Sequence, residues 1–160
     1  MDDFNKPIIN YLSVSDKVFR DKDFTDKIWH MVKLSHCKFY NCNFERAKLT
    51  LFMSPFSEFA DCQFDGAFIQ YSDFSGSVLQ NCSLVESDIL HSNFNGIEGN
   101  NLDFSDSDLY LSRFRSSQLR NIKFVDCNLK RVDFQGCRRH EVTFKYSNFE
   151  EAFFDSESSQ

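Results

Sequence analysis

The sequence is poor in the residues and segments that mark linkers, membrane spans and secretion signals. Only 5 of its 160 residues are glycine and 2 are proline, so no flexible linker divides the chain, and its length suits a single domain. It has no apolar run of about 18 residues, which a transmembrane helix would need. Residues 1–12 are acidic and lack the basic and apolar regions of a signal peptide. We therefore expect a cytoplasmic protein, while export by a route without a signal peptide remains open.

Enzyme motifs are absent as well. The sequence contains no P-loop, no GxGxxG fingerprint and no GxSxG nucleophile elbow. The four histidines, which fit neither metal-ligand nor triad spacing, are His30, His36, His91 and His140. The sequence therefore predicts a protein that acts by binding, with no catalytic site, no cofactor and no metal.

Basic residues are missing from one long block. Residues 51–110 contain ten Asp and Glu residues and no Lys or Arg, whereas the segments on either side each carry a small positive net charge. Phosphate contacts need a basic stripe, so direct binding of nucleic acid is disfavoured. An acidic surface would instead attract a basic partner, although it would also serve simply as a solvated face that keeps the protein soluble.

A large apolar residue recurs at every fifth position. In the stretch from Leu102 to Phe134 these residues are Phe104, Leu109, Phe114, Leu119, Phe124, Leu129 and Phe134. A helix would repeat at about 3.6 residues and a strand at about 2, so a period of five is an internal repeat of another kind. Four such segments would close one coil of about 20 residues, and coils would stack at roughly 4.8 Å. The central apolar residue and the mostly small residue two positions before it would then point inward.

At this point the sequence resembles the pentapeptide-repeat proteins. The segments SDFSG (72–76), SDSDL (105–109) and CNLKR (127–131) match that family's repeat of a small residue, Asp or Asn, then Leu or Phe. The resemblance implies an all-β fold, a right-handed quadrilateral β-helix, here with about seven coils. Residues 1–16 would form an N-terminal cap, residues 17–154 the β-helix, and residues 155–160 a disordered tail. Because Lys17, Lys22 and Lys27 occupy the small inward position, we expect residues 17–31 to form a less regular coil.

Three places interrupt the repeat. In residues 50–58 the centre is Ser54, the small position is Phe52, and Pro55 removes a backbone donor, so we expect a bulged or looped side. Gly99 and Arg139 also occupy centres, and Arg139 must either turn outward or distort its coil. The six cysteines all lie at the small position, and Cys42, Cys62 and Cys82 share one column. We interpret them as buried apolar residues rather than as a soft-metal site.

The acidic residues fall into repeated positions. Glu86, Asp106 and Asp126 are 20 residues apart, as are Asp88 and Asp108, and we expect Asp73, Glu98 and Asp103 to surround them on one acidic face. The segments 16–24, 37–44 and 93–104 resemble the quinolone-resistance branch of the family. That resemblance implies a rod that imitates duplex DNA, binds DNA gyrase or topoisomerase IV in its basic groove, and protects it from quinolones.

A second function stays open. The chain would serve as a protein-interaction scaffold or an exported effector without a topoisomerase partner, using exposed apolar residues. Candidates are the predicted loop residues Phe52, Met53 and Phe56, together with Phe68, Tyr71 and Tyr110. The last coil has no covering helix, so we expect Phe149, Phe153 and Phe154 to form an apolar end through which two copies pair.

Overall fold

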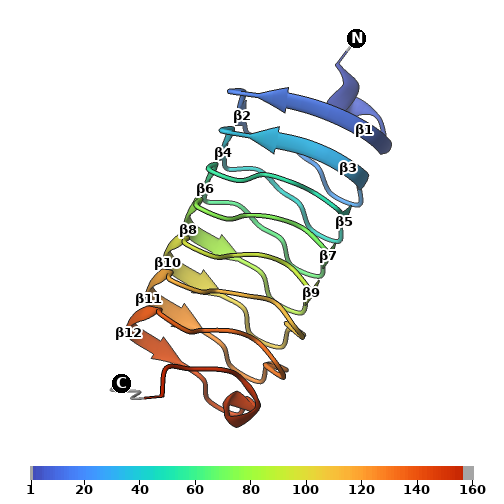
Figure 1. Cartoon of the computed structure of the whole chain (residues 1–160). Coiled ribbons are helices and arrows are strands. Elements are labelled where there is room, and N and C mark those ends of the chain that lie inside the picture. Colours follow the sequence, from blue (N-terminus) through green and yellow to red (C-terminus); the bar gives the residue numbers. More distant parts are fainter. Residues whose placement is uncertain (1, 157–160) are drawn as a thin grey trace.

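The computed structural model describes residues 2–156, which wind into a rod of stacked four-sided coils (Figure 1). Its strands are β1 (Ile8–Ser15), β2 (Val18–Arg20), β3 (Ile28–Ser35), β4 (Lys38–Tyr40), β5 (Lys48–Thr50), β6 (Glu58–Ala60), β7 (Phe68–Gln70), β8 (Val78–Ser83), β9 (Asp88–Leu90), β10 (Glu98–Asp103), β11 (Gln118–Lys123) and β12 (Arg138–Thr143). Two short 3-10 helices, η1 (Asp3–Asn5) and η2 (Phe149–Glu151), lie near the two ends. No helix in the described part of the chain is long and apolar enough to cross a membrane.

All strand pairing is parallel and joins residues 20 positions apart. One sheet has the order β1-β3-β5-β7-β9, and the other has the order β12-β11-β10-β8-β6-β4-β2. Ile8 pairs with Ile28 and Glu98 pairs with Gln118, so each coil contains 20 residues. The architecture is the predicted right-handed quadrilateral β-helix of about seven coils.

Each coil has four faces, which we number in chain order. The first face carries β5, β7 and β9, and the third carries β2, β4 and β6. The second and fourth faces are joined mainly by single bridges such as Lys33↔Met53 and Asp23↔Asn43. The longer strands turn a corner: β1 and β3 run from the first face onto the second, and β8, β10, β11 and β12 run from the third onto the fourth.

The corners have an unusual backbone. Every residue two positions after a centre, from Tyr11 to Tyr146, has a positive φ, at 24 non-glycine and 4 glycine positions. This left-handed conformation turns the chain and directs the corner side chain into solvent. The N–H of a corner residue donates a hydrogen bond to a carbonyl of the next coil, as when Asp21 N–H donates to the Tyr40 carbonyl at 3.0 Å.

The interior is a column of stacked rings. Phe39 lies on Phe59 with centroids 4.6 Å apart, and Phe104 lies on Phe124 at 5.0 Å. Burying each phenylalanine side chain contributes about 1.5–3 kcal/mol. This repeated burial holds together a chain whose individual coils are too thin to have a core of their own.

The bulge expected at residues 50–58 is absent. Phe52 is 0% exposed, and its ring lies 5.7 Å from the rings of both Trp29 and Phe74. Ser54 is also buried, and its hydroxyl donates to the Leu34 carbonyl at 2.8 Å. The large and small residues have exchanged positions within one repeat, so the interior stays filled and the coil stays regular.

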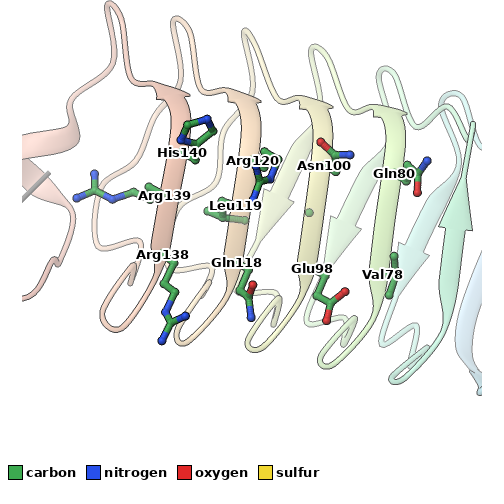
Figure 2. A pocket seen from close by; sticks show the side chains of 11 residues that line it. Val78, Gln80, Glu98, Asn100, Gln118, Leu119, Arg120, Arg138, Arg139 and His140 are labelled. Carbon is green, nitrogen blue, oxygen red and sulfur yellow. The ribbon is translucent and has the colours of Figure 1, made fainter.

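The other two irregular centres also keep their register. Gly99 pairs with Leu79 and Leu119, and Leu102 occupies part of the space above it. Arg139 pairs with Leu119, and its guanidinium lies 4.8 Å from the ring centroid of Phe154. Arg139 therefore neither leaves the interior side nor distorts its coil, because it lies at the end of the rod, where it points along the axis (Figure 2).

The N-terminal coils are more regular than expected. β2 pairs in register with β4, so residues 17–31 are not a transitional coil. The Lys27 ammonium donates to the carbonyls of Asn5 and Lys6 at 2.9 and 3.0 Å, and thereby ties η1 to the rod. Since β1 pairs with β3, the coiled region extends to Ile8, within the segment 1–16 expected to be a cap.

The C-terminal segment is described as far as residue 156. The Asp155 carboxylate accepts the N–H of Gly136 at 3.0 Å, whereas the corresponding corner amide of Ser116 donates to the Gln135 carbonyl. Most of the expected disordered tail, residues 157–160, lies outside the described residues.

Candidate protein-interaction surface

Five of the predicted acidic residues share one edge of the rod. Glu86, Asp106 and Asp126 occupy successive corners between the fourth and first faces, where a positive φ directs each side chain outward. Asp88 and Asp108 lie beside them on the first face, where a parallel backbone β-bridge joins the two residues. We call these five residues, Glu86, Asp88, Asp106, Asp108 and Asp126, the acidic edge.

Among the residues that the structure describes, a single carboxylate of the acidic edge has a hydrogen-bonding partner. Asp108 accepts the Nδ2–H of Asn128 at 2.9 Å and the N–H of Tyr110 at 3.0 Å, and Asn148 supports Asn128 in turn. Within the described residues, the other four carboxylates accept no hydrogen bond and form no ion pair. Adjacent like charges repel by up to about 1 kcal/mol in water. The positive φ of the corners suits aspartate at positions 106 and 126, but it does not require a carboxylate in every coil of the edge.

The other three predicted acidic residues lie elsewhere. Asp73 is on the second face, Glu98 on the third and Asp103 on the fourth. Asp73 and Asp103 each accept the backbone N–H two residues ahead, at 2.8 and 2.9 Å. These two carboxylates stabilise the local turn, so the expected single face of eight acids is an edge of five.

A basic groove, which sequence reasoning missed, lies on the third face near the C-terminal end (Figure 2). One wall is formed by Arg138, Gln118 and Glu98, and the other by His140, Arg120 and Asn100. The signal was available, because Arg120 and His140 are 20 residues apart. Three arginines and one carboxylate line the groove, so it is net positive, whereas the acidic edge consists of five carboxylates.

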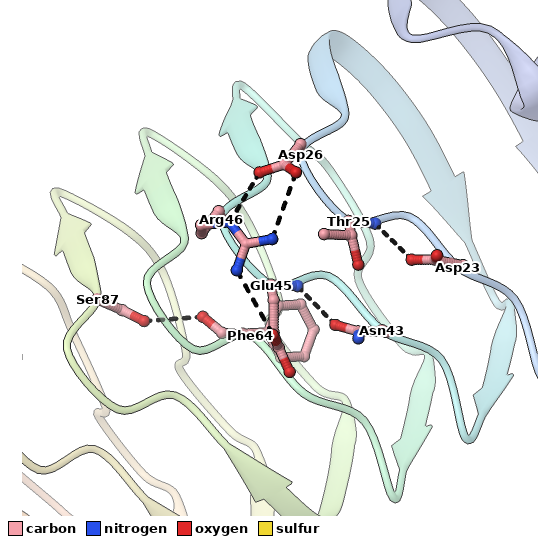
Figure 3. A network of polar contacts seen from close by, with 8 residues as sticks. All are labelled: Asp23, Thr25, Asp26, Asn43, Glu45, Arg46, Phe64 and Ser87. Atoms are coloured by element: carbon pink, nitrogen blue, oxygen red, sulfur yellow. Dashed lines mark hydrogen bonds and ion pairs between the residues drawn. The ribbon is translucent and has the colours of Figure 1, made fainter.

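The acidic edge has a sharp N-terminal limit. In the same corner column, Arg46 pairs with Asp26 at 2.9 Å and lies 3.7 Å from Glu45 (Figure 3). On the C-terminal side the corner is Tyr146, with the Lys145 ammonium 4.9 Å from its ring centroid. The unpaired carboxylates are thus confined to the central part of the column.

The predicted loop contact is only partly accessible. Phe52 is buried, so its expected exposure is wrong, and Met53 is half-buried on the second face. Phe56 is 60% exposed, stacks on His36 and lies across Gly76. A Cβ at residue 76 would be 2.5 Å from the Phe56 ring, and its φ of +67° also favours glycine.

The C-terminal end presents apolar rings, as expected. Phe149 and Phe153 are 51% and 46% exposed, and Phe154 is half-buried beneath Arg139. The end of the rod is therefore apolar on one side and cationic at its centre.

The cysteines form no metal site in the part of the chain that the structure describes. No group of three or more His, Cys, Asp or Glu side chains there is arranged to hold a metal ion. The thiols of Cys42 and Cys62 donate to the carbonyls of Phe19 and Phe39. Burial raises the pKa of the Cys127 and Cys137 thiols to about 11, which keeps them protonated and unreactive at neutral pH.

The repeat unit itself identifies the family. Two family descriptions match the sequence: "Pentapeptide repeat region" over residues 85–144 and "Pentapeptide repeats (8 copies)" over residues 57–96. Together they cover residues 57–144, more than half of the chain. The chain belongs to the pentapeptide-repeat family. Pentapeptide-repeat proteins generally act as binding scaffolds rather than as catalysts.

Several solved structures of pentapeptide-repeat proteins are similar to this one. A trypsin-treated form of QnrB1, a plasmid-mediated fluoroquinolone resistance protein, is 19% identical, with 88% of this chain and 78% of that chain covered and a TM-score of 0.45. Rfr23 from the cyanobacterium Cyanothece 51142 is 9% identical, with coverages of 93% and 92% and a TM-score of 0.46. HetL from Nostoc sp. strain PCC 7120, a protein involved in heterocyst differentiation regulation, is 10% identical, with coverages of 96% and 93% and a TM-score of 0.43. The comparison with curated proteins finds no match.

Proposed function

We propose that this pentapeptide-repeat protein is a non-catalytic mimic of duplex DNA that binds the basic groove of a type II topoisomerase, such as DNA gyrase. The acidic edge carries this proposal: five carboxylates occupy three successive coils, and four of them have no partner in the described structure. This function would place the protein in the cytoplasm, and protection of the enzyme from quinolones would follow from competition with DNA.

The dimensions of the acidic edge support the proposal. With coils stacked at roughly 4.8 Å, the edge carries one carboxylate per roughly 2–3 Å, whereas B-DNA carries one charge per about 1.7 Å of its axis. A rod of about seven coils is roughly 34 Å long, close to one turn of B-DNA. A groove that accommodates a duplex would therefore meet a rod of similar length, with a comparable charge density along the three coils of the acidic edge.

The test is a gyrase supercoiling assay with purified protein, with and without a fluoroquinolone. We expect the wild-type protein to inhibit supercoiling or to protect against the drug, and Glu86→Lys/Asp106→Lys/Asp126→Lys to lose at least about 100-fold in potency, because the changes reverse the field that guides association. The three new ammonium groups would lie at solvent-facing corners beside the carboxylates of Asp88 and Asp108, so the variant should fold normally.

The matched control is Asp16→Lys/Glu98→Lys/Glu141→Lys, which changes the net charge equally at exposed positions away from the acidic edge. It should retain activity within about threefold, because exposed charges farther apart than a Debye length of about 8–10 Å are largely screened. If micromolar wild-type protein has no effect on gyrase, the DNA-mimic proposal is wrong, and the scaffold or exported-effector function takes its place.

We also propose that two copies pair through the apolar C-terminal end. At micromolar concentration the wild-type protein should sediment with twice its mass of 18.8 kDa, whereas Phe149→Ser/Phe153→Ser should be monomeric because it removes the exposed rings from that end. Phe56→Ser, an exposed ring in the middle of the rod, should remain dimeric. A monomeric wild-type protein would contradict this proposal without affecting the first.

A further inference from the structure

A second edge of the rod is apolar. The corners between the first and second faces carry large apolar or aromatic residues in six successive coils: Tyr11, Met31, Leu51, Tyr71, His91 and Leu111. Tyr11, Met31 and Tyr71 are 73%, 43% and 51% exposed, and the other three are half-buried. We call this column the apolar ridge.

The backbone of the apolar ridge is unfavourable for the residues that occupy it. All six have φ between 50° and 62°, in the left-handed region. This region disfavours bulky L-residues such as Tyr, Met and Leu by about 1–2 kcal/mol each, whereas Asn, Asp and His enter it more readily, so five of the six residues are disfavoured. The corners between the third and fourth faces follow that preference, with Asp21, Asn41, Asp61, Asn81, Asn101 and Asn121. Neither local conformation nor contact with solvent explains why the apolar ridge is apolar.

Two side chains in the middle of the ridge are held in place by aromatic contacts. The rings of Tyr71 and His91 stack with centroids 5.0 Å apart, and Tyr110 meets His91 edge-on at 5.7 Å. Rings that are already ordered lose little conformational freedom on binding, which favours their use as contact residues.

The apolar ridge and the acidic edge border the same face. Glu86 and His91 are the two corners of the first face in one coil, and Asp106 and Leu111 are those of the next. Five residues span at most roughly 17 Å, so a single partner reaches both. The central part of the first face therefore has carboxylates along one side and aromatic or aliphatic side chains along the other.

We propose that the partner of the acidic edge also binds the apolar ridge, and that this partner is a protein with an apolar cleft beside its basic groove. The inference rests on the proposed function and deepens it. The acidic edge would speed association with many basic surfaces, whereas burial of the ridge would lengthen the lifetime of the complex only where such a cleft exists. The ridge thus selects the correct partner among proteins that bind DNA.

Replacement of ridge residues by asparagine tests this without the risk of unfolding. Asparagine suits a positive φ, so Tyr71→Asn/His91→Asn/Leu111→Asn should be at least as stable as the wild-type protein in thermal denaturation. Binding to immobilised gyrase, measured over a series of NaCl concentrations, should weaken by at least about 30-fold through faster dissociation. The slope of log Kd against log salt should stay unchanged, whereas Glu86→Lys/Asp106→Lys/Asp126→Lys should reduce that slope.

His36→Asn/Phe56→Asn is the matched control, because it makes the same change at exposed corners off the ridge. It should bind gyrase like the wild-type protein. Wild-type affinity of the ridge variant would overturn the inference and leave the proposed function standing. A ridge variant that alters the sedimentation mass but not the affinity for gyrase would also overturn it, and would identify a second copy as the occupant. Failure of the wild-type protein to bind gyrase would overturn both.

Discussion

Replacement of Phe52 by alanine is expected to lower the free energy of unfolding by about 3–5 kcal/mol. The side chain is 0% exposed and contacts the rings of Trp29 and Phe74. Its removal would leave a cavity next to Ser54, which is too small to fill it. The measurement is chemical denaturation followed by circular dichroism, with the wild-type protein as reference.

The control for this prediction is Phe56→Ala, four residues away on the surface. Phe56 is 60% exposed, so its truncation should change the free energy of unfolding by less than about 0.5 kcal/mol. If residues 50–58 formed a loop with Phe52 in solvent, both variants would behave alike. A loss below about 1 kcal/mol for Phe52→Ala would contradict the burial described above.

The period of five was sufficient to predict the coil and its pairing register. It follows from the spacing of centres such as Phe104 and Phe124 that coils contain 20 residues, and Phe104 indeed stacks on Phe124. The conformation of an irregular repeat cannot be predicted from that repeat alone. Exchange of large and small residues between Phe52 and Ser54 preserves the filled volume, and only the packing in three dimensions reveals the compensation.

The candidate site was predictable in part. The spacing of Glu86, Asp106 and Asp126 places them in one column, and the structure agrees. The spread of Asp73 and Asp103 over other faces was also implicit in their offsets from that column. The spacing could not predict that these two carboxylates accept hydrogen bonds from backbone N–H groups. Charge alone does not distinguish a carboxylate that stabilises a turn from one that is free to bind.

Replacement of Gly99 by phenylalanine, a side chain that is typical of the central repeat position, is expected to destabilise the rod. Gly99→Phe should lower the free energy of unfolding by about 3 kcal/mol, at the upper end of the range for overpacking. Even a Cβ at this position would lie 3.0 Å from Leu102 Cδ1 and 3.3 Å from Leu119 Cδ2.

The same contact predicts how the loss is repaired. Leu102→Ala alone should lower the free energy of unfolding by about 2–5 kcal/mol because it opens a cavity. The loss in the double variant Gly99→Phe/Leu102→Ala should be smaller than the sum of the two single losses by at least about 1.5 kcal/mol. The new ring would occupy the volume that the leucine vacates, as Phe52 does beside Ser54. Additive losses in this double-mutant cycle would show that the side chains at the two positions do not occupy the same space. Exchange of volume between neighbouring positions would then not explain why irregular repeats keep a regular coil.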